Sequence, residues 1–174
     1  MPKNKLQRSW HVLYARSRFE NVVHDSLLKK SMEVFLPKIK VSRKRRDRKV
    51  VIQVPLFPGY LFVKTDLHPV EHLEIKKTVG VVSLVGNAEG PVSVPEHALE
   101  SLKIMACGDQ FIETGRRVKA GSRVMVIRGP FTGIEGILVR QKGKGRVIVN
   151  IDPLEQFAGV EIDMDDIEVL PTIS

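Results

Sequence analysis

The sequence predicts an α+β protein of two modules. The first is an α/β sandwich in which three helices cover a mainly antiparallel sheet, and the second is a small five-stranded β-barrel. Three observations predict this organisation. Helix and strand periodicities alternate in the first part of the chain, glycine-separated Val and Ile strands fill the last part, and positive charge is concentrated in the first part. A chain of 174 residues is long enough for both modules.

The first module begins with a strand and a helix. The segment WHVLY at 10–14 consists mainly of β-prone residues and predicts a strand. Apolar residues then recur at helical spacing and predict a helix over 18–31. Ser17 and Glu20 have the spacing of a capping box, in which both side chains accept hydrogen bonds from backbone amides at the helix N-terminus.

The remainder of the first module alternates between strands and helices. VFLP at 34–37 predicts a short strand, and two β-prone arms around a charged middle predict a long hairpin with its tip near Arg45–Arg48. Proline suits the first turn of a helix, so prolines before helical patterns indicate helix starts. The further strands and helix starts are predicted at 60–64, Pro69, 79–86 and Pro95.

The second module follows a segment without regular periodicity. Residues 107–117 predict a linker, so the predicted domains are residues 1–106, a linker over 107–118, and a barrel over 119–174. After Gly121, Val and Ile alternate in the strand period, and glycines mark the turns. Five short strands bury a core by closing into a barrel.

The charge differs between the two modules. The formal net charge is +8; residues 1–107 carry 19 Lys and Arg against 10 Asp and Glu, whereas residues 108–174 carry 9 against 10. This asymmetry predicts different partners for the two modules, with a polyanion as the partner of the first.

Catalytic and metal-binding functions find no support in the sequence. The 5 histidines have no metal-ligand spacing and no companion nucleophile motif, and the single Cys107 cannot form an intramolecular disulfide. The acidic residues between Glu161 and Glu168 lack the spacing of a calcium loop. We therefore expect no enzyme activity, no cofactor and no metal. No apolar stretch is long enough for a membrane span and no signal-peptide pattern is present, so we expect a cytoplasmic protein.

The segment Lys38–Lys49 is a candidate nucleic-acid contact. It holds eight Lys and Arg residues and a single acid, Asp47. A solvated hairpin arm is the simpler interpretation, but clustered cations repel one another and phosphate backbones reward such clusters through counterion release. Because the run contains no aromatic residue, we expect contact with the sugar–phosphate backbone rather than stacking on bases.

The segment PLFPGYLFVK at 55–64 is a candidate protein interface. Pro58 and Gly59 interrupt its apolar run, although proline and glycine normally weaken the interior of a strand. One interpretation places Phe57, Tyr60 and Phe62 in the core. The break instead suggests that part of this aromatic cluster turns outward, and exposed apolar patches usually mark protein interfaces.

Several blocks of the sequence together resemble one family. WHVLYARSRFE, FLPKIK, PLFPGYLFVK, KKTVGVV and GSRVMVIRGPFTGIEG, in this order over about residues 9–170, are similar to the NusG family of transcription elongation factors. The segment PLFPGYLFV and the short length of the chain are most similar to specialised paralogs such as RfaH, LoaP and UpxY. The resemblance implies an N-terminal NGN domain and a C-terminal KOW domain with an SH3-like barrel, connected by a linker.

The resemblance also implies roles for individual residues. In the family, the PGY break borders a hydrophobic depression that takes the clamp helices of RNA polymerase's largest subunit. The RNA polymerase-binding positions that it implies here are Tyr14, Phe57, Pro58, Gly59, Tyr60 and Phe62. The nucleic-acid-binding set combines the family's basic face with the basic run, and consists of Arg16, Arg43, Lys44, Arg45, Arg46, Arg48 and Thr78. Phe131 and Leu154 correspond to KOW partner-binding positions, with a small-subunit ribosomal protein or Rho as the partner.

These inferences together predict a non-enzymatic transcription elongation and antitermination factor. It would bind the polymerase clamp as a monomer, bridge the DNA cleft and suppress pausing on particular long operons, with upstream or non-template DNA and nascent RNA as further partners. Where RfaH has a second polymerase contact, this chain has Glu71-His72-Leu73. Two alternatives stay open. One is a housekeeping NusG, and the other is a ribosome-associated KOW-type RNA-binding protein, which would not need the aromatic FPGY cluster.

Overall fold

The structure is a computed structural model that describes residues 7–141 and 143–172. By backbone contacts the chain divides after Pro95 into two compact units, Met1–Pro95 and Glu96–Ser174. Each unit contains both helix and strand.

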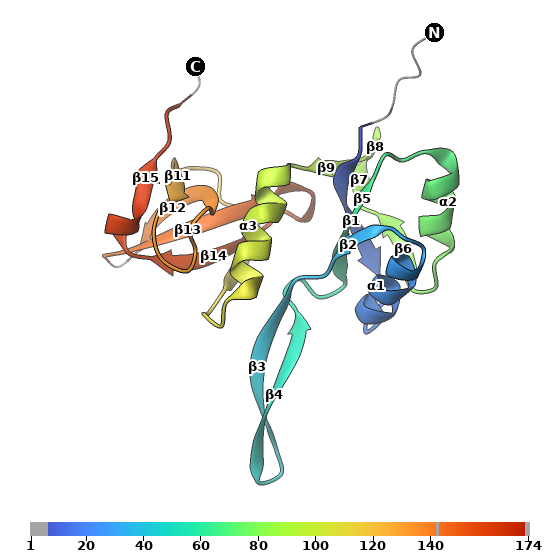
Figure 1. Cartoon of the computed structure of the whole chain (residues 1–174), viewed down its shortest axis with the longest axis horizontal. Coiled ribbons are helices and arrows are strands. Elements are labelled where there is room, and N and C mark those ends of the chain that lie inside the picture. The colour runs from blue at the N-terminus through green and yellow to red at the C-terminus, as the bar shows by residue number, and fades with distance from the viewer. Residues whose placement is uncertain (1–6, 142, 173–174) are drawn as a thin grey trace. The chain divides into compact units, whose positions relative to one another are not determined.

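The first unit is built on a five-stranded antiparallel sheet (Figure 1). Its strands are β1 (Ser9–Ala15), β2 (Glu33–Phe35), β5 (Tyr60–Thr65), β6 (Val81–Leu84) and β9 (Ser93–Val94). The order is β2-β5-β1-β6, and β9 pairs with the start of β1. The sheet brings β1 and β5 together at its centre, with Tyr14 opposite Tyr60.

One face of this sheet carries the core of the unit. Successive strand side chains point to opposite faces, so Leu13 of β1 and Leu61 and Val63 of β5 point to the same side. They pack in one cluster with residues of helix α1 (Glu20–Lys29) and helix α2 (Pro69–Lys77). The helix residues of this cluster are Val23, Leu27 and Ile75.

Two hairpins leave the sheet. Strands β3 (Lys38–Arg45) and β4 (Arg48–Pro55) form an isolated two-stranded ribbon that extends away from the sheet (Figure 1). The predicted hairpin with its tip near Arg45–Arg48 is therefore confirmed. Strands β7 (Gly86–Asn87) and β8 (Gly90–Pro91) form a very short second hairpin, which the sequence patterns did not predict.

The second unit is a helix followed by a six-stranded antiparallel sheet. The helix is α3 (Glu96–Cys107), and the strands are β10 (Glu113–Arg116), β11 (Ser122–Val126), β12 (Glu135–Gln141), β13 (Lys144–Ile151), β14 (Gln156–Ile162) and β15 (Ile167–Val169). The sheet order is β10-β14-β13-β12-β11-β15. Two single-turn 3-10 helices, η1 (Asp152–Leu154) and η2 (Met164–Asp166), connect strands.

The structure differs from the sequence-based predictions in three places. Residues 113–116, predicted as linker, form β10, because their backbone pairs with β14 although the segment lacks an apolar alternation. Helix α3 groups with the second unit: the Ser101 hydroxyl hydrogen-bonds both the N–H and the C=O of Glu135 in β12, at 3.1 and 3.3 Å. Helix α1 begins at Glu20 rather than at residue 18, and its N-cap residue Phe19 makes no side-chain capping bond.

Within residues 7–141 and 143–172, no helix is both long enough and apolar enough to cross a membrane. Over the same residues, His, Cys, Asp and Glu side chains form no group of three that could hold a metal ion.

Candidate functional site

The FPGY segment forms a tight turn between β4 and β5. The Tyr60 N–H donates to the Phe57 carbonyl at 2.9 Å, and Gly59 has φ +88°. Proline at the second position and a positive φ at the third are the requirements of a type II turn, and glycine meets the second of them without strain. Pro58 and Gly59 thus end the hairpin and start β5, which explains why they interrupt the apolar run.

The turn sets two tyrosines side by side. Tyr14 and Tyr60 are directly opposite on β1 and β5, and their ring centroids lie 5.3 Å apart at an interplanar angle of 32°. A Cβ atom on Gly59 would lie 3.3 Å from Cε2 of Tyr14, so only glycine leaves ordinary contact distance to this ring. Tyr14 is 41% exposed, Tyr60 is half-buried and Pro58 is exposed. We call these three residues the tyrosine surface.

The other two aromatic side chains of the predicted interface are buried. Phe57 is 1% exposed and Phe62 is 0% exposed. Phe62 points to the same face as its cross-strand partner Phe35, and the two rings lie 6.3 Å apart in a stacked arrangement. That Phe57 and Phe62 contact the polymerase stays a prediction, and in this structure the turn presents only its tyrosines and Pro58 to the outside. The two phenylalanines support the tyrosine surface from within the protein.

A buried carboxylate fixes the turn to helix α1. The Gly59 N–H donates to Oε1 of Glu20 at 2.9 Å, and the Gly59 carbonyl accepts from the Ala15 N–H at 2.8 Å. Glu20 is 7% exposed. This replaces the predicted capping box, since the Glu20 side chain reaches a distant turn rather than the start of its own helix. The spacing that suggested a cap gives no sign of this tertiary contact.

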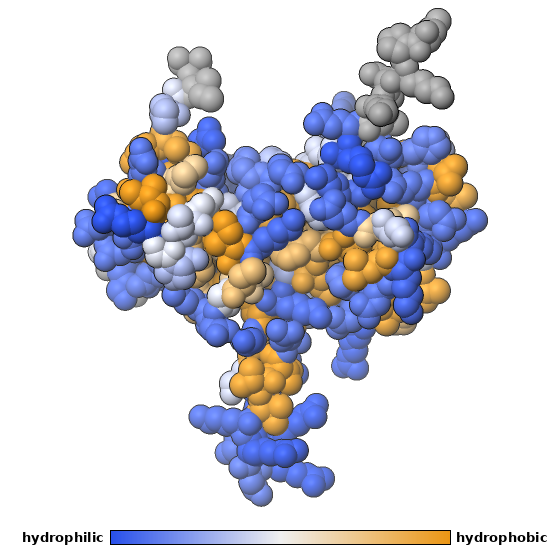
Figure 2. Space-filling model, in the orientation of Figure 1, coloured by the Kyte–Doolittle hydropathy of each residue, from blue (hydrophilic) through white to orange (hydrophobic). Residues whose placement is uncertain are grey.

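We call the β3–β4 hairpin the arm. The predicted basic run Lys38–Lys49 covers all of β3 and the start of β4, and six of its eight cations lie in the outer half of the arm. Its tip consists of two cross-strand pairs, Arg45–Arg48 and Lys44–Lys49, around the turn at Arg46 and Asp47. All six residues are exposed, as is Arg43 next to them. Figure 2 shows hydrophilic side chains at the tip and hydrophobic ones between the tip and the sheet.

The two remaining nucleic-acid candidates differ in accessibility. Arg16 is exposed in the loop between β1 and α1, where its N–H donates to the Gly80 carbonyl at 2.8 Å. Thr78 is 5% exposed. Its hydroxyl donates to the Glu74 carbonyl at 2.8 Å and accepts from Nζ of Lys30 at 3.0 Å. The nucleic-acid contact of Thr78 stays a prediction, and its hydroxyl is already hydrogen-bonded at the end of helix α2.

The two predicted partner contacts of the KOW domain, Phe131 and Leu154, also differ in accessibility. Phe131 is 3% exposed. Its ring lies close to Gly108, since a Cβ atom placed on that glycine would be 3.8 Å from Cε1 of Phe131. Phe131 therefore packs near the end of α3, and its role as a partner contact stays a prediction. Leu154 is half-buried in η1, where a neighbouring residue, Glu155, has φ +52°. Only Leu154 of this pair is accessible.

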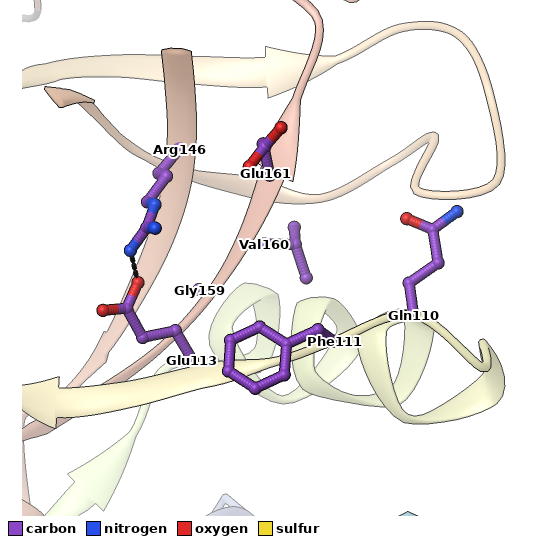
Figure 3. A pocket seen from close by; sticks show the side chains of 7 residues that line it. All are labelled: Gln110, Phe111, Glu113, Arg146, Gly159, Val160 and Glu161. Atoms are coloured by element: carbon purple, nitrogen blue, oxygen red, sulfur yellow. Dashed lines mark ion pairs between the residues drawn. The ribbon is translucent and has the colours of Figure 1, made fainter. Parts of the chain in front are cut away.

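An exposed aromatic residue in the second unit does not follow from any of the sequence patterns. Phe111 is 82% exposed and lies two residues before the start of β10, at the rim of a small pocket of about 170 Å³ (Figure 3). Arg146 and Glu113 form an ion pair across one wall of this pocket. Typical small-molecule sites have volumes of roughly 300–1,000 Å³. The pocket is smaller than that range. Its charged groups are all paired, since Arg146 and Glu113 pair with each other and Glu161 pairs with Lys144 at 3.2 Å.

Comparisons with known proteins all identify the same family. A family model described as "Transcription termination factor nusG" matches residues 8–103. The transcription termination/antitermination protein NusG of Streptococcus pyogenes serotype M3 is 24% identical over 172 residues, covering 91% of this chain and 96% of the relative. The protein of the same description from Bacillus subtilis is 26% identical over 181 residues, covering 95% and 100%.

The fold agrees with these relatives. A solved structure described as "Domain interaction in Thermotoga maritima NusG" has a TM-score of 0.53 at 19% identity, and the match covers 95% of this chain and 98% of that one. The family model spans more than half of the chain and includes both the tyrosine surface and the arm. The chain belongs to the NusG family of transcription termination and antitermination factors.

Proposed function

We propose that this protein is a transcription elongation and antitermination factor that binds RNA polymerase through the tyrosine surface. The observation that carries the proposal is the adjacent Tyr14–Tyr60 pair, held outward by the FPGY turn. Exposed tyrosines next to a rigid turn are typical of interface hot spots, because they offer a large apolar area at a small entropic cost. The expected contact is the tip of the clamp helices of the largest subunit.

Binding at this position would act on transcription without any bond being made or broken. A protein that bridges the DNA cleft favours the closed clamp, and pausing requires the clamp to open. A ligand shifts such an equilibrium only by its differential affinity for the two states. The role is therefore non-enzymatic, and its place of action is the cytoplasm, where bacterial transcription occurs.

The arm supplies the proposed nucleic-acid contact. Its tip cations are exposed, and among the described residues no carboxylate forms an ion pair with Arg43, Arg45 or Arg48. Uncompensated cations on a projecting ribbon favour a polyanion. Arg16 is a second exposed cation on the same unit, and Leu154 is the proposed contact of the KOW domain with a protein partner.

The proposal includes a specialised role on particular long operons. A housekeeping NusG would dock in the same way, and the Streptococcus and Bacillus relatives are NusG proteins of that general description. Selective action distinguishes the two roles. Transcription with and without the protein, on its own operon and on unrelated templates, separates a specialist from a general factor.

The docking assignment is tested with Tyr60→Ala. Loss of an anchor from a desolvated interface typically costs roughly 2 kcal/mol or more of binding free energy. We expect weaker binding to core RNA polymerase, measured with purified components, and an unchanged circular dichroism spectrum. Leu28→Ala is a matched control, because Leu28 is a similarly large and 49% exposed side chain on α1 and belongs to no proposed polymerase contact. Equal binding by wild type and the folded Tyr60→Ala variant would refute the docking assignment.

A further inference from the structure

The arm has two chemically distinct halves. Cross-strand partners share a face of the ribbon, so the register assigns every residue of β3 and β4 to one side. Near the sheet, one side is an apolar stripe of half-buried residues: Ile39, Val41, Val50, Ile52 and Val54. Packing across the two strands within this stripe stiffens a ribbon that would otherwise be marginally stable on its own.

Beyond the stripe, cations occupy both sides of the ribbon. Arg43, Arg45 and Arg48 lie on the side of the apolar stripe, and Lys44 and Lys49 lie on the opposite side. A flat polyanionic surface would be matched by cations on one side only. Charge on both sides matches a recess whose two walls are both lined with phosphates, which is the arrangement of a duplex groove.

The dimensions of the charged half fit one kind of groove. Two paired strands lie about 4.8 Å apart, so a ribbon with its side chains fits a B-DNA major groove of about 12 Å but not a minor groove of about 6 Å. Lys38 and Lys40 lie near the sheet, and the dense cluster of the other six cations begins at Arg43, two residues before Arg45 at the end of β3. Two residues of strand span about 7 Å, close to the major-groove depth of about 8.5 Å. The apolar stripe therefore begins where the ribbon would leave the groove.

From these relationships we infer that the arm inserts its tip, end-on, into the major groove of duplex DNA. The inference rests on the proposed nucleic-acid contact of the arm and names its partner. Double-stranded RNA is excluded as an equal partner because its major groove is deep and narrow. Single strands are disfavoured because residues 38–55 contain no aromatic residue on which bases could stack.

The test measures binding of the full-length protein to short probes by fluorescence anisotropy. The probes are a mixed-sequence DNA duplex, the same sequence as double-stranded RNA, and one DNA strand alone. We expect the DNA duplex to bind several-fold more tightly than either of the others. A DNA duplex in which cytosine is replaced by glucosylated 5-hydroxymethylcytosine, whose sugar fills the major groove, should bind more weakly. Netropsin added to the unmodified duplex fills the minor groove and should leave the affinity unchanged.

Charge variants connect this binding to the arm. Arg45→Gln/Arg48→Gln should lower the slope of log affinity against log salt by about 0.9 for each phosphate that the arm no longer neutralises. Lys76→Gln/Lys77→Gln removes the same charge from exposed positions on α2 and should leave the slope unchanged. Both variants should retain binding to core polymerase without nucleic acid.

The outcomes separate the inference from the proposed function. A reduced slope together with equal binding to double-stranded RNA, or with displacement by netropsin, would overturn groove insertion and retain the nucleic-acid contact. An unchanged slope in the arm variant would overturn both. The polymerase contact is measured independently, through Tyr60→Ala.

Discussion

The backbone N–H of Gly59 donates to the buried carboxylate of Glu20 at 2.9 Å, joining the FPGY turn to the first turn of α1. The same glycine accepts from Ala15 on the neighbouring strand. The turn is thus held by one strand and one helix at once. The tyrosine surface is positioned by contacts that lie beneath it, and those contacts can be tested separately from docking.

Removing the Glu20 carboxylate should loosen the turn. Glu20→Ala leaves a buried N–H without its acceptor, which typically costs about 1–3 kcal/mol of unfolding free energy. Glu20→Gln keeps an acceptor oxygen and should cost less. Urea denaturation of both variants measures the difference. If Glu20→Ala is as stable as Glu20→Gln, the hydrogen bond to Gly59 does not hold the turn.

The two aromatic positions of β5 should respond differently to truncation. Phe62 is fully buried, so Phe62→Ala should lower the unfolding free energy by about 3–5 kcal/mol, as phenylalanine truncations in cores do. Tyr60→Ala removes a half-buried ring and should cost clearly less stability. Thermal and urea unfolding of both variants give the comparison. A stable Phe62→Ala variant that no longer binds polymerase would show that Phe62 is a contact residue.

The contrast between Tyr60 and Phe62 also shows what the sequence could predict. The strand, the break and the hairpin before it follow from local patterns, because alternation, proline and glycine act on the residues next to them. Which aromatics face outward depends on residues far away in the chain. Phe62 stacks on Phe35 and Phe57 is 1% exposed, so local alternation alone could not separate them from Tyr60.

The boundary between the modules escapes sequence-based prediction for a similar reason. Helix α3 has an apolar face that any packing partner could cover, and the sequence does not reveal that Ser101 hydrogen-bonds Glu135 in β12. Strand β10 resembles a linker because its residues, ETGR, include only one β-prone side chain, Thr114. Backbone pairing with β14 overrides that weak local preference.

Stability should fall on mild acidification because of His11. Burial lowers the pKa of His11 below its ordinary value. The hydrogen bond that Nδ1 donates to the Ser9 carbonyl at 3.0 Å raises the pKa in part, and the charge of His72 lowers it further. The unfolded chain therefore binds a proton near pH 6.5 that the folded protein takes up only at lower pH. The contribution to stability is complete above about pH 6.5 and is lost as the pH falls toward the folded pKa.

Urea denaturation at a series of pH values from neutral to mildly acidic checks this prediction. His11→Gln removes the titrating group and should flatten that part of the pH profile. His97→Gln is the matched control, since His97 lies on α3 in the other unit and should leave the profile unchanged. A wild-type profile identical to that of His11→Gln would show that His11 does not titrate differently in the folded and unfolded states.

The second unit should keep its β structure in the free protein, without the conversion to a helical hairpin that RfaH undergoes. Strands β11 and β13 are dominated by Val and Ile, which lose side-chain freedom in helices and pack well in sheets. Gly129, Pro130 and Gly133 would interrupt a helix across this region, at about 1 kcal/mol for each glycine and about 3 kcal/mol for proline. A helical form would carry all of these costs together.

If the second unit keeps its β structure, the tyrosine surface should bind polymerase without an activating nucleic-acid signal. Far-UV circular dichroism of the full-length protein should give the helix content of α1, α2 and α3, which hold 10, 9 and 12 residues, and residues 118–174 alone should give a β spectrum. A clear excess of helix in the full-length spectrum would contradict the prediction, and polymerase binding that appears only after a nucleic-acid signal is added would contradict its functional consequence.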